Sequence, residues 1–341
     1  MKQNYSFDDV LLLPQYSEVF SREDISLEIR MRAGPTLQLP IVSAPMDTVT
    51  GSHMATTMWE CGGLGIIHRY NSIEGQCQLV RKAQSGINRL VGAAIGVSSD
   101  YLERALALTK AGVSVLCVDV AHGHHAMMRH ALRVLRNTLG SDIHIMAGNV
   151  ATLEGFNDLA DWGADSIRVG IGGGSICSTR IQTGHGRPTL ASVMDCGVSD
   201  RDALLIADGG IRSPGDIVKA LAAGADLVMV GSLLAGTVET PGKVYEQKDG
   251  NSVKAYRGMA SREAQIEWRG RVSSDEGVSR FIPLKGSVVP VLESLDKSIK
   301  SGLSYSGAMT INDLQVKAKF IRQSSSAQVE SSTHVDLVKG G

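Results

Sequence analysis

The loop Gly170–Arg187 gathers the residue types best suited to chemistry in this chain. It reads GIGGGSICSTRIQTGHGR, follows the apolar run Ser166–Val169 and comes before a helical pattern that starts near Pro188. Its six glycines permit backbone conformations that other residues avoid, so the loop can turn several N–H and C=O groups toward a ligand. Long loops of this kind in compact domains usually carry function.

Cys177 lies in the middle of that loop, close to Ser175 and Thr179. A thiolate is the strongest ordinary nucleophile of a protein, and its reactivity depends on surroundings that lower its pKa. Backbone amides and Arg180 are the groups that would do so here. The alternative is a free cysteine that acts as a small buried hydrophobe, and we expect that role for Cys61, Cys77, Cys117 and Cys196.

The composition fits one large enzyme domain. The 341 residues are 43% hydrophobic and 20% charged, which is enough for a full core. The formal net charge of −1 gives no overall field that would attract nucleic acid or an anionic membrane, so we expect neither as a partner. Five scattered cysteines favour a reducing compartment over disulfides. Because the N-terminus lacks a signal-peptide pattern and no apolar run approaches the ~20 residues that span a bilayer, we expect a cytoplasmic protein.

Short apolar runs recur along the chain after an N-terminal arm of about 36 residues. They are rich in Val, Ile and Leu and do not alternate with polar residues, which is typical of parallel strands buried on both faces. There are eight of them: Ile41–Ser43, Leu64–Ile67, Leu90–Ile95, Val115–Val118, Ile143–Met146, Ser166–Val169, Leu204–Ala207 and Leu227–Val230.

Amphipathic helical patterns separate these runs, for example at Ile73–Ser85, Ala126–Leu139 and Ser213–Ala223. Three helix–strand joints repeat one phrase, KAGVSVL, DWGADSI and AAGADLV. In each, we expect the glycine to end the helix at C′ and the next strand to begin at once. Eight consecutive units predict a closed (β/α)8 barrel. An open doubly wound sheet is the alternative, but it does not require eight such units without an antiparallel signal.

In such a barrel the chemistry lies at the C-terminal ends of the strands. Asp208-Gly209-Gly210 and Gly231-Ser232 are typical of a phosphoribosyl site, with a carboxylate for ribose hydroxyls and helix N-terminal amides for phosphate. An Asp at a strand end is often only an N-cap, so the joint placement of many such residues on one rim favours a site. The others are Met46, Asp47, His68, Arg69, Asp119 and Asn149.

Segments 236–285 and 324–341 depart from the repeating pattern. The first is too long and polar for a plain loop, and we interpret it as a flap that closes over the site and excludes water. A solvated surface excursion is the alternative. A helix at Val288–Ser301 then resumes the barrel. We assign residues 1–335 to one catalytic domain and residues 324–341 to a polar tail that is disordered unless it docks on a neighbour.

Several phrases in fixed order carry a resemblance: AGN at Ala147–Asn149, GSICSTR around Cys177, ADGGI at Ala207–Ile211, MVGSLLAG at Met229–Gly236 and YRGM at Tyr256–Met259. With them the chain resembles the IMP dehydrogenase/GMP reductase family over nearly its whole length. The resemblance implies a (β/α)8 barrel, usually a homotetramer, that acts on a purine nucleoside monophosphate. It also implies a cysteine that attacks C2 of the purine to give a covalent thioimidate, with hydride exchanged with a nicotinamide cofactor.

The resemblance implies roles for matching positions. Cys177 matches the nucleophile and Thr179 the threonine that handles protons beside it. A potassium ion would be held by the loop of Gly172, Gly174 and Cys177, with Arg180 nearby. The remaining matches are substrate contacts at Ser175, Asp208, Gly209, Gly210, Gly231, Ser232, Tyr256, Gly258, Met259, Ala260 and Gly277, and cofactor contacts at Ser21, Arg22, Arg69, Asp119, Val120, Ala121, Asn149 and Gly172.

The two activities of the family differ in what the flap must supply. The dehydrogenase hydrolyses its thioimidate with water that an Arg-Tyr pair on a long flap activates. Here Glu276 follows Gly258 by 18 positions, and the segment contains Arg269 and Arg271 but no tyrosine. This short flap resembles the reductase, in which the matching glutamate partners the threonine in protonating the departing amine. The lack of a CBS domain between residues 88 and 119 and the phrase Asp119-Val120-Ala121 also resemble the reductase.

Other phrases favour the dehydrogenase, namely VSAPMDTVT at Val42–Thr50, GGLGIIH at Gly62–His68 and SSAQVE at Ser325–Glu330. The reductase pattern also has an arginine where this chain has Ser273. We predict a GMP reductase that converts GMP and NADPH to IMP, ammonia and NADP. The alternatives are an IMP dehydrogenase without CBS domains and a catalytically silent purine nucleotide-binding protein, and the intact Cys177 loop argues against the latter.

Overall fold

The computed structural model describes residues 4–34, 36–85, 89–248, 250–273 and 275–331. Eight parallel strands close into a barrel in the order β10-β11-β4-β5-β6-β7-β8-β9, with β9 pairing β10. This confirms the predicted (β/α)8 fold. The strands are β4 (Ile41–Ser43), β5 (Leu64–Ile67), β6 (Gly92–Ile95), β7 (Val115–Asp119), β8 (His144–Val150), β9 (Ser166–Val169), β10 (Leu204–Asp208) and β11 (Leu227–Val230).

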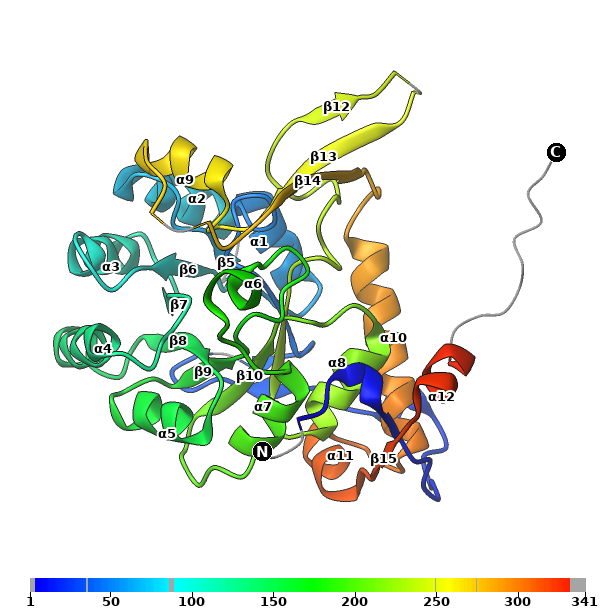
Figure 1. Ribbon diagram of the computed structural model, residues 1–341. Helices are drawn as coiled ribbons and strands as arrows, with labels where there is room; N and C mark the ends of the chain where they lie inside the picture. The colour runs from blue at the N-terminus through cyan, green and yellow to red at the C-terminus, as the bar shows by residue number, and fades with distance from the viewer. Residues whose placement is uncertain (1–3, 35, 86–88, 249, 274, 332–341) are drawn as a thin grey trace.

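Helices surround this barrel (Figure 1). Side-chain caps start several of them: Ser72 accepts from the N–H of Gly75, and Thr152 accepts from that of Gly155, as N-cap residues do. The barrel helices are α1 (Ser52–Glu60), α2 (Ile73–Gln84), α3 (Tyr101–Lys110), α4 (Ala126–Leu139), α5 (Leu153–Asp161), α7 (Thr189–Cys196), α8 (Pro214–Ala222) and α10 (Val289–Tyr305), and the short α6 (Thr179–Thr183) lies in the loop after β9.

The repeated glycine phrase ends its helices as expected. Gly112, Gly163 and Gly224 each lie two residues beyond the last helical residue and have φ values of +93°, +111° and +111°. This is the left-handed region that favours glycine. The tight stop lets each following strand enter the barrel without a long connection.

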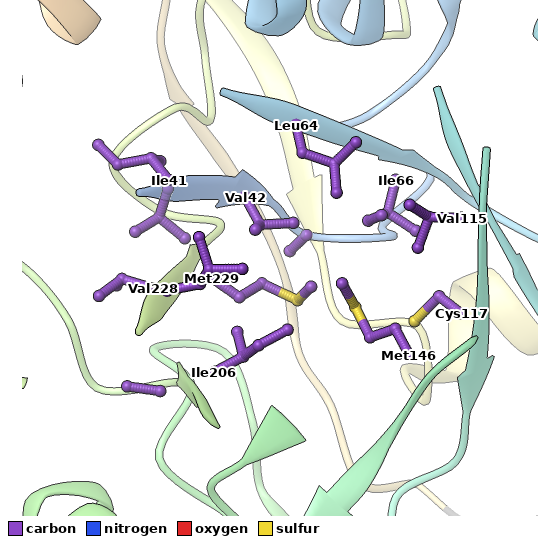
Figure 2. Packing of buried hydrophobic residues seen from close by; sticks show 14 of the residues in the cluster. Ile41, Val42, Leu64, Ile66, Val115, Cys117, Met146, Ile206, Val228 and Met229 are labelled. Atoms are coloured by element: carbon purple, nitrogen blue, oxygen red, sulfur yellow. The ribbon is translucent and has the colours of Figure 1, made fainter. Parts of the chain in front are cut away.

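Apolar side chains from facing strands fill the barrel. Figure 2 shows residues such as Val42, Met146 and Ile206 gathered between the strands, and all three are completely buried. Burial on both faces explains why the strands read as continuous apolar runs.

Two strands near the ends of the described chain pair with each other beside the barrel. Strand β1 (Val10–Leu12) runs antiparallel to β15 (Phe320–Arg322). The tail beyond begins with a short helix, α12 (Ser325–Glu330), that Ser324 caps and that contacts η1. Residues 332–341 of the predicted tail lie outside the described ones, and the disorder of an undocked tail stays a prediction. The other small elements of the arm and tail are η1 (Phe7–Asp9), η2 (Arg22–Asp24), β2 (Ile29–Arg30), β3 (Thr36–Leu37) and α11 (Ile311–Lys317).

The segment 236–285 contains regular structure that the sequence patterns did not predict. It forms a three-stranded antiparallel sheet of β12 (Val244–Glu246), β13 (Ser252–Arg257) and β14 (Ser279–Pro283), with helix α9 (Arg262–Arg269) between the last two strands. The hairpin of β12 and β13 projects beyond the barrel (Figure 1), whereas Trp268 of α9 stacks on Tyr70, which follows β5. Among the described helices, none is long and apolar enough to cross a membrane.

Candidate active site

A cavity of about 380 Å3 lies at the carboxyl ends of the barrel strands. Its wall combines the loops after β4, β5, β7, β8, β9, β10 and β11 with residues of the flap. This is where (β/α)8 enzymes hold their substrates, and the volume lies within the usual range for small-molecule sites.

Cys177 lines this cavity at the start of α6, and its Sγ donates to Thr179 Oγ1 over 3.2 Å. The spacing of two residues places both side chains on one side of the turn that leads into α6. A thiol and a hydroxyl in contact are the minimum for a nucleophile with a proton-handling partner.

The flap is joined to the Cys177 loop by backbone hydrogen bonds. The N–H of Ser178 donates to the carbonyl of Glu276 at 3.0 Å, and the N–H of Val278 donates to that of Ile176 at 3.0 Å. Cys177 and Gly277 also form an antiparallel bridge. This pairing brings Glu276 to the wall that Cys177 and Thr179 line, so a thiol, a hydroxyl and a carboxylate share one cavity.

A buried arginine connects two carboxylates on the cavity floor. Arg168, at the third position of β9, has only 8% of its side chain exposed, and it contacts Asp119 at 2.6 Å and Asp208 at 2.8 Å. Burial opposes ionisation of Asp119, but Arg168 and Arg69 more than offset it, so the pKa of Asp119 lies below its ordinary value. Asp119 is therefore held ionised, and the guanidinium of Arg168 orients both carboxylates.

Asn149 extends this network to the Cys177 loop. Its Nδ2 donates to Asp208 Oδ2 and to the carbonyl of Gly170, both at 2.8 Å. Asp208 thus receives hydrogen bonds from two side chains, Asn149 and Arg168. A carboxylate fixed in this way presents its remaining lone pairs in one direction.

Two glycines allow the loops after β9 and β10 to meet. A Cβ on Gly170 would lie 1.9 Å from the carbonyl oxygen of Asp208, and one on Gly173 would lie 2.6 Å from Thr189 Oγ1. Gly170 also has a φ of +147°, which other residues rarely adopt. The loops can approach each other this closely because glycine has no Cβ atom.

Tyr256 lies at the opposite wall, on β13. It is 6% exposed, its hydroxyl lies 3.3 Å from Ser175 Oγ, and burial raises the pKa of this tyrosine. A Cβ on Gly231 would lie 3.3 Å from the same hydroxyl. Tyrosine and serine hydroxyls therefore converge beside the Gly231 turn, a combination that suits a phosphate group.

Contacts from the barrel rim hold the flap in place. Asp47, after β4, accepts from Arg257 at 2.5 Å, and Arg257 also contacts Glu267 of α9 at 2.7 Å. Tyr70, after β5, donates to the carbonyl of Met259 at 2.5 Å. The same tyrosine stacks on Trp268 with ring centroids 5.4 Å apart. These contacts fix the segment that carries Gly258 and Met259 over the cavity.

Most of the residues predicted from the sequence come together here. The lining includes Cys177, Thr179, Glu276, Ser175, Asp208, Gly209, Gly210, Gly231, Ser232, Tyr256, Gly258, Met259, Ala260, Arg69, Asp119, Val120, Ala121, Asn149, Gly172 and Gly174. Gly277 does not line the cavity but packs closely on Gly258. Whether each binds substrate or cofactor stays a prediction.

Ser21 and Arg22 do not reach this cavity. They belong to the arm, whose short helix η2 packs on α10, and Arg22 lies over the ring of Tyr305 at 6.0 Å. Within one chain they lie away from this cavity, because the arm follows α10 rather than the rim, and their contact with a cofactor stays a prediction.

Arg180 also lies outside the cavity wall. Its guanidinium donates to the carbonyls of Ile171 at 3.4 Å and Arg187 at 2.5 Å. The cationic side chain braces the glycine loop and cannot itself be a ligand to potassium, and the expected place of Arg180 near a cation site stays a prediction. Only its backbone carbonyl has the chemistry of a cation ligand, and that carbonyl accepts from Gly184 at 3.2 Å.

The site contains residues that sequence reasoning missed. The signal for Arg168 was a lone charge inside an apolar strand, DSIRVG, because such a charge is retained only when it is paired. Tyr70, Gln265 and Ser273 gave no local signal that placed them in a site. Arg269 was noted only as part of the flap segment, but it too lines the cavity.

The chain is similar to a known family over almost its full length. The family model described as "IMP dehydrogenase / GMP reductase domain" matches residues 4–334. An inosine-5'-monophosphate dehydrogenase of Nitrosopumilus maritimus is 34% identical over 472 aligned residues, covering 98% of both chains. A GMP reductase of Leishmania major is also 34% identical, over 479 residues, covering 98% of this chain and 97% of that protein.

The structure is similar to that of the GMP reductase variant C318A from Trypanosoma brucei in complex with guanosine 5'-monophosphate. The TM-score is 0.93 at 30% identity, with 98% of each chain covered. Both sequence alignments exceed the 341 residues of this chain, so both relatives contain additional residues. Because one of these longer relatives is a reductase, the shorter length of this chain does not distinguish reductase from dehydrogenase.

Proposed function

Because the chain belongs to the IMP dehydrogenase/GMP reductase family, we propose that it is a GMP reductase that converts GMP and NADPH to IMP, ammonia and NADP. The observation that carries the proposal is the shared cavity of Cys177, Thr179 and Glu276. A thiol beside a proton relay is what expulsion of an amine requires, since ammonia leaves only when it is protonated.

In the proposed reaction the Cys177 sulfur bonds to C2 of GMP, and the C2–N bond to the amino group breaks. Thr179 and Glu276 pass the proton that lets the amine leave as ammonia, which leaves a thioimidate on Cys177. NADPH, as co-substrate, then supplies hydride to C2. The C–S bond breaks, the thiolate of Cys177 is regenerated and IMP is released.

The cavity also contains groups that suit the nucleotide. Asp208, held by Asn149 and Arg168, would accept hydrogen bonds from ribose hydroxyls. The hydroxyls of Ser175 and Tyr256 and the amides of Gly231 and Ser232 would receive the phosphate. The similar Trypanosoma brucei protein is in complex with guanosine 5'-monophosphate, which supports a purine nucleotide as the substrate.

Binding of NADPH draws support from Arg69. Its Nε is buried and forms no hydrogen bond in the described parts of the chain, although Asp119 lies 3.7 Å away. A donor without a hydrogen-bond partner, in the cavity that Val120 and Ala121 also line, suits a polar cofactor group. We also propose a potassium ion at the loop of Gly172, Gly174 and Cys177, because rings of backbone carbonyl oxygens are ligands that suit this cation.

A homotetramer is proposed as well, and the N-terminal arm supports it. Tyr16 and Phe20 are 86% and 101% exposed, and a second copy would bury these rings. Ser21 and Arg22 do not reach the cavity of their own chain. In such an assembly they could contact a cofactor bound in the cavity of a neighbouring subunit.

The direct test compares two reactions of the purified protein by reduced-nicotinamide absorbance. With GMP and NADPH we expect a decrease, and with IMP and NAD no increase. An increase only in the second would establish the dehydrogenase, the second candidate, which the 34% identity to a dehydrogenase and the presence of Arg269 in the cavity favour. No change in either would favour a silent nucleotide-binding protein.

Two substitutions test the assigned roles. Cys177→Ala is expected to abolish turnover while GMP still binds, and an active variant would refute covalent catalysis. Glu276→Gln is expected to slow ammonia release more than hydride return, so equal slowing in single-turnover experiments would refute its role as proton donor to the amine.

A further inference from the structure

Gln265 is a buried polar side chain on α9, where Ala264 is buried as well. It lies in α9 with 3% of its surface exposed and lines the cavity, whereas the next residue, Ile266, is 47% exposed. A primary amide is costly to bury unless its donors and acceptor are paired. Its position on the inner face therefore requires specific partners.

Those partners lie at two separate places in the flap. Gln265 Nε2 donates to the carbonyl of Ala260 at 2.9 Å, and its Oε1 accepts from both the N–H and the Oγ of Ser273, at 3.0 and 2.9 Å. Ala260 precedes α9 and Ser273 follows it. One side chain thus fixes the entry and the exit of the helical excursion.

The exit leads directly to Glu276. The N–H of Glu276 donates to the same carbonyl of Ala260 at 3.2 Å, and its own carbonyl accepts from Ser178 at 3.0 Å. The Ala260 carbonyl is therefore a shared anchor for Gln265 and for Glu276. Without the Gln265 amide, Ser273 would lose its acceptor, and the Ala260 carbonyl would keep only the hydrogen bond from Glu276. The segment that places Glu276 against the Cys177 loop would then be less constrained.

We propose that Gln265 is a positioning residue that holds the Glu276 carboxylate in reach of Cys177 and Thr179; this rests on the proposed role of Glu276 in the reductase reaction. Ser273 stands where the reductase pattern has an arginine. The Gln265–Ser273 pair is the device with which this chain orders that part of its flap.

The test is Gln265→Met, which keeps the length of the side chain and removes its polar atoms. The matched control is Ile266→Met on the exposed face of the same helix. We expect kcat for GMP-dependent NADPH oxidation to fall about 10–100-fold in Gln265→Met, the usual effect of a displacement near 1 Å. The KM for GMP should change far less, and Ile266→Met should match the wild type.

A double variant separates positioning from general support of the fold. If Gln265 acts through Glu276, Gln265→Met should reduce kcat little further in a Glu276→Gln background, because the group it positions is already gone. Independent losses that multiply in the double variant would overturn the proposal. So would an unchanged kcat in Gln265→Met.

Alkylation of Cys177 by iodoacetamide, followed by peptide mass spectrometry, gives a readout without turnover. The flap covers the Cys177 loop through the Ser178–Glu276 backbone hydrogen bond and the Cys177–Gly277 bridge. A loosened flap should therefore expose Cys177 and speed alkylation in Gln265→Met, whereas Glu276→Gln keeps this backbone pairing and should react like the wild type. Equal rates in wild type and Gln265→Met would overturn the proposal even if the wild type has no reductase activity. That inactivity would itself refute the proposed function.

A second variant guards against misfolding. If Gln265→Met fails to fold, Gln265→Glu retains an acceptor for Ser273 but loses the donor to Ala260. We expect it to lower kcat and to speed alkylation in the same direction. Wild-type values for both in a folded Gln265→Glu would refute the role of the Ala260 bond.

Discussion

Replacing Arg168 by methionine leaves two carboxylates of the cavity floor without their common partner. Arg168, Asp119 and Asp208 have 8%, 18% and 15% of their side chains exposed, so solvent cannot take the place of the guanidinium. Removal of one member of a buried ion pair costs about 3–5 kcal/mol, because the remaining charge is left uncompensated.

This loss of unfolding free energy corresponds to a lower melting temperature (Tm). Unfolding entropy is about 2.1 cal/mol/K per residue near 60 °C, and the chain has 341 residues. A loss of about 3–5 kcal/mol then lowers Tm by about 4–7 °C. Differential scanning calorimetry at neutral pH, with a test for reversibility, measures this directly.

The pH dependence shows whether charge is the cause. In the wild type the pKa of Asp119 is lowered, so its ion pair stabilises the fold above the unfolded pKa and loses this effect as the pH falls through the folded pKa. Without Arg168 the pKa of the buried Asp119 should rise. Protonation of Asp119 at lower pH should then remove the unpaired charge that destabilises the variant. The Tm difference between wild type and variant should therefore be smaller at pH 5 than at pH 7.5.

A matched control is Arg201→Met, because Arg201 pairs with Asp161 and Asp200 on the surface. Exposed ion pairs contribute little, so its Tm should stay close to that of the wild type. The reasoning is refuted if Arg168→Met melts like the control. An equal Tm difference at both pH values would assign the loss to packing rather than to unpaired charge.

The remaining predictions concern the barrel and its loops. Burial raises the pKa of Asp226 from 3.8 to about 6, so folding favours its protonated form. The stability that this carboxyl contributes should be lost as the pH rises from 4 to 6, and Asp226→Asn should lack this pH dependence; Tm–pH curves that run parallel in the two proteins would contradict the prediction. Gly170→Ala places a Cβ against the Asp208 carbonyl and should weaken GMP binding at least about tenfold, since Asp208 must move. Gly184→Ala, with a positive φ but open space around it, should leave binding unchanged in the same titration.

Local patterns were sufficient to predict most of the barrel. Runs such as Leu227–Val230 are buried on both faces, so they carry a continuous apolar signal. Strand β12 carries no such signal, because all three of its residues are exposed. Its sequence pattern also does not indicate the pairing with β13. The flap sheet therefore became visible only in the structure.

The candidate site divides in the same way. Cys177 and Thr179 are two residues apart, so their contact follows from the local turn and the sequence alone determined it. The placement of Glu276, Gln265 and Arg168 depends on which segments meet across the barrel, and that is a property of tertiary packing. The position of Ser21 and Arg22 beside α10 is likewise a result of tertiary packing. Sequence determines the chemistry available and the local order of the elements, whereas distances between remote segments arise only when the barrel closes.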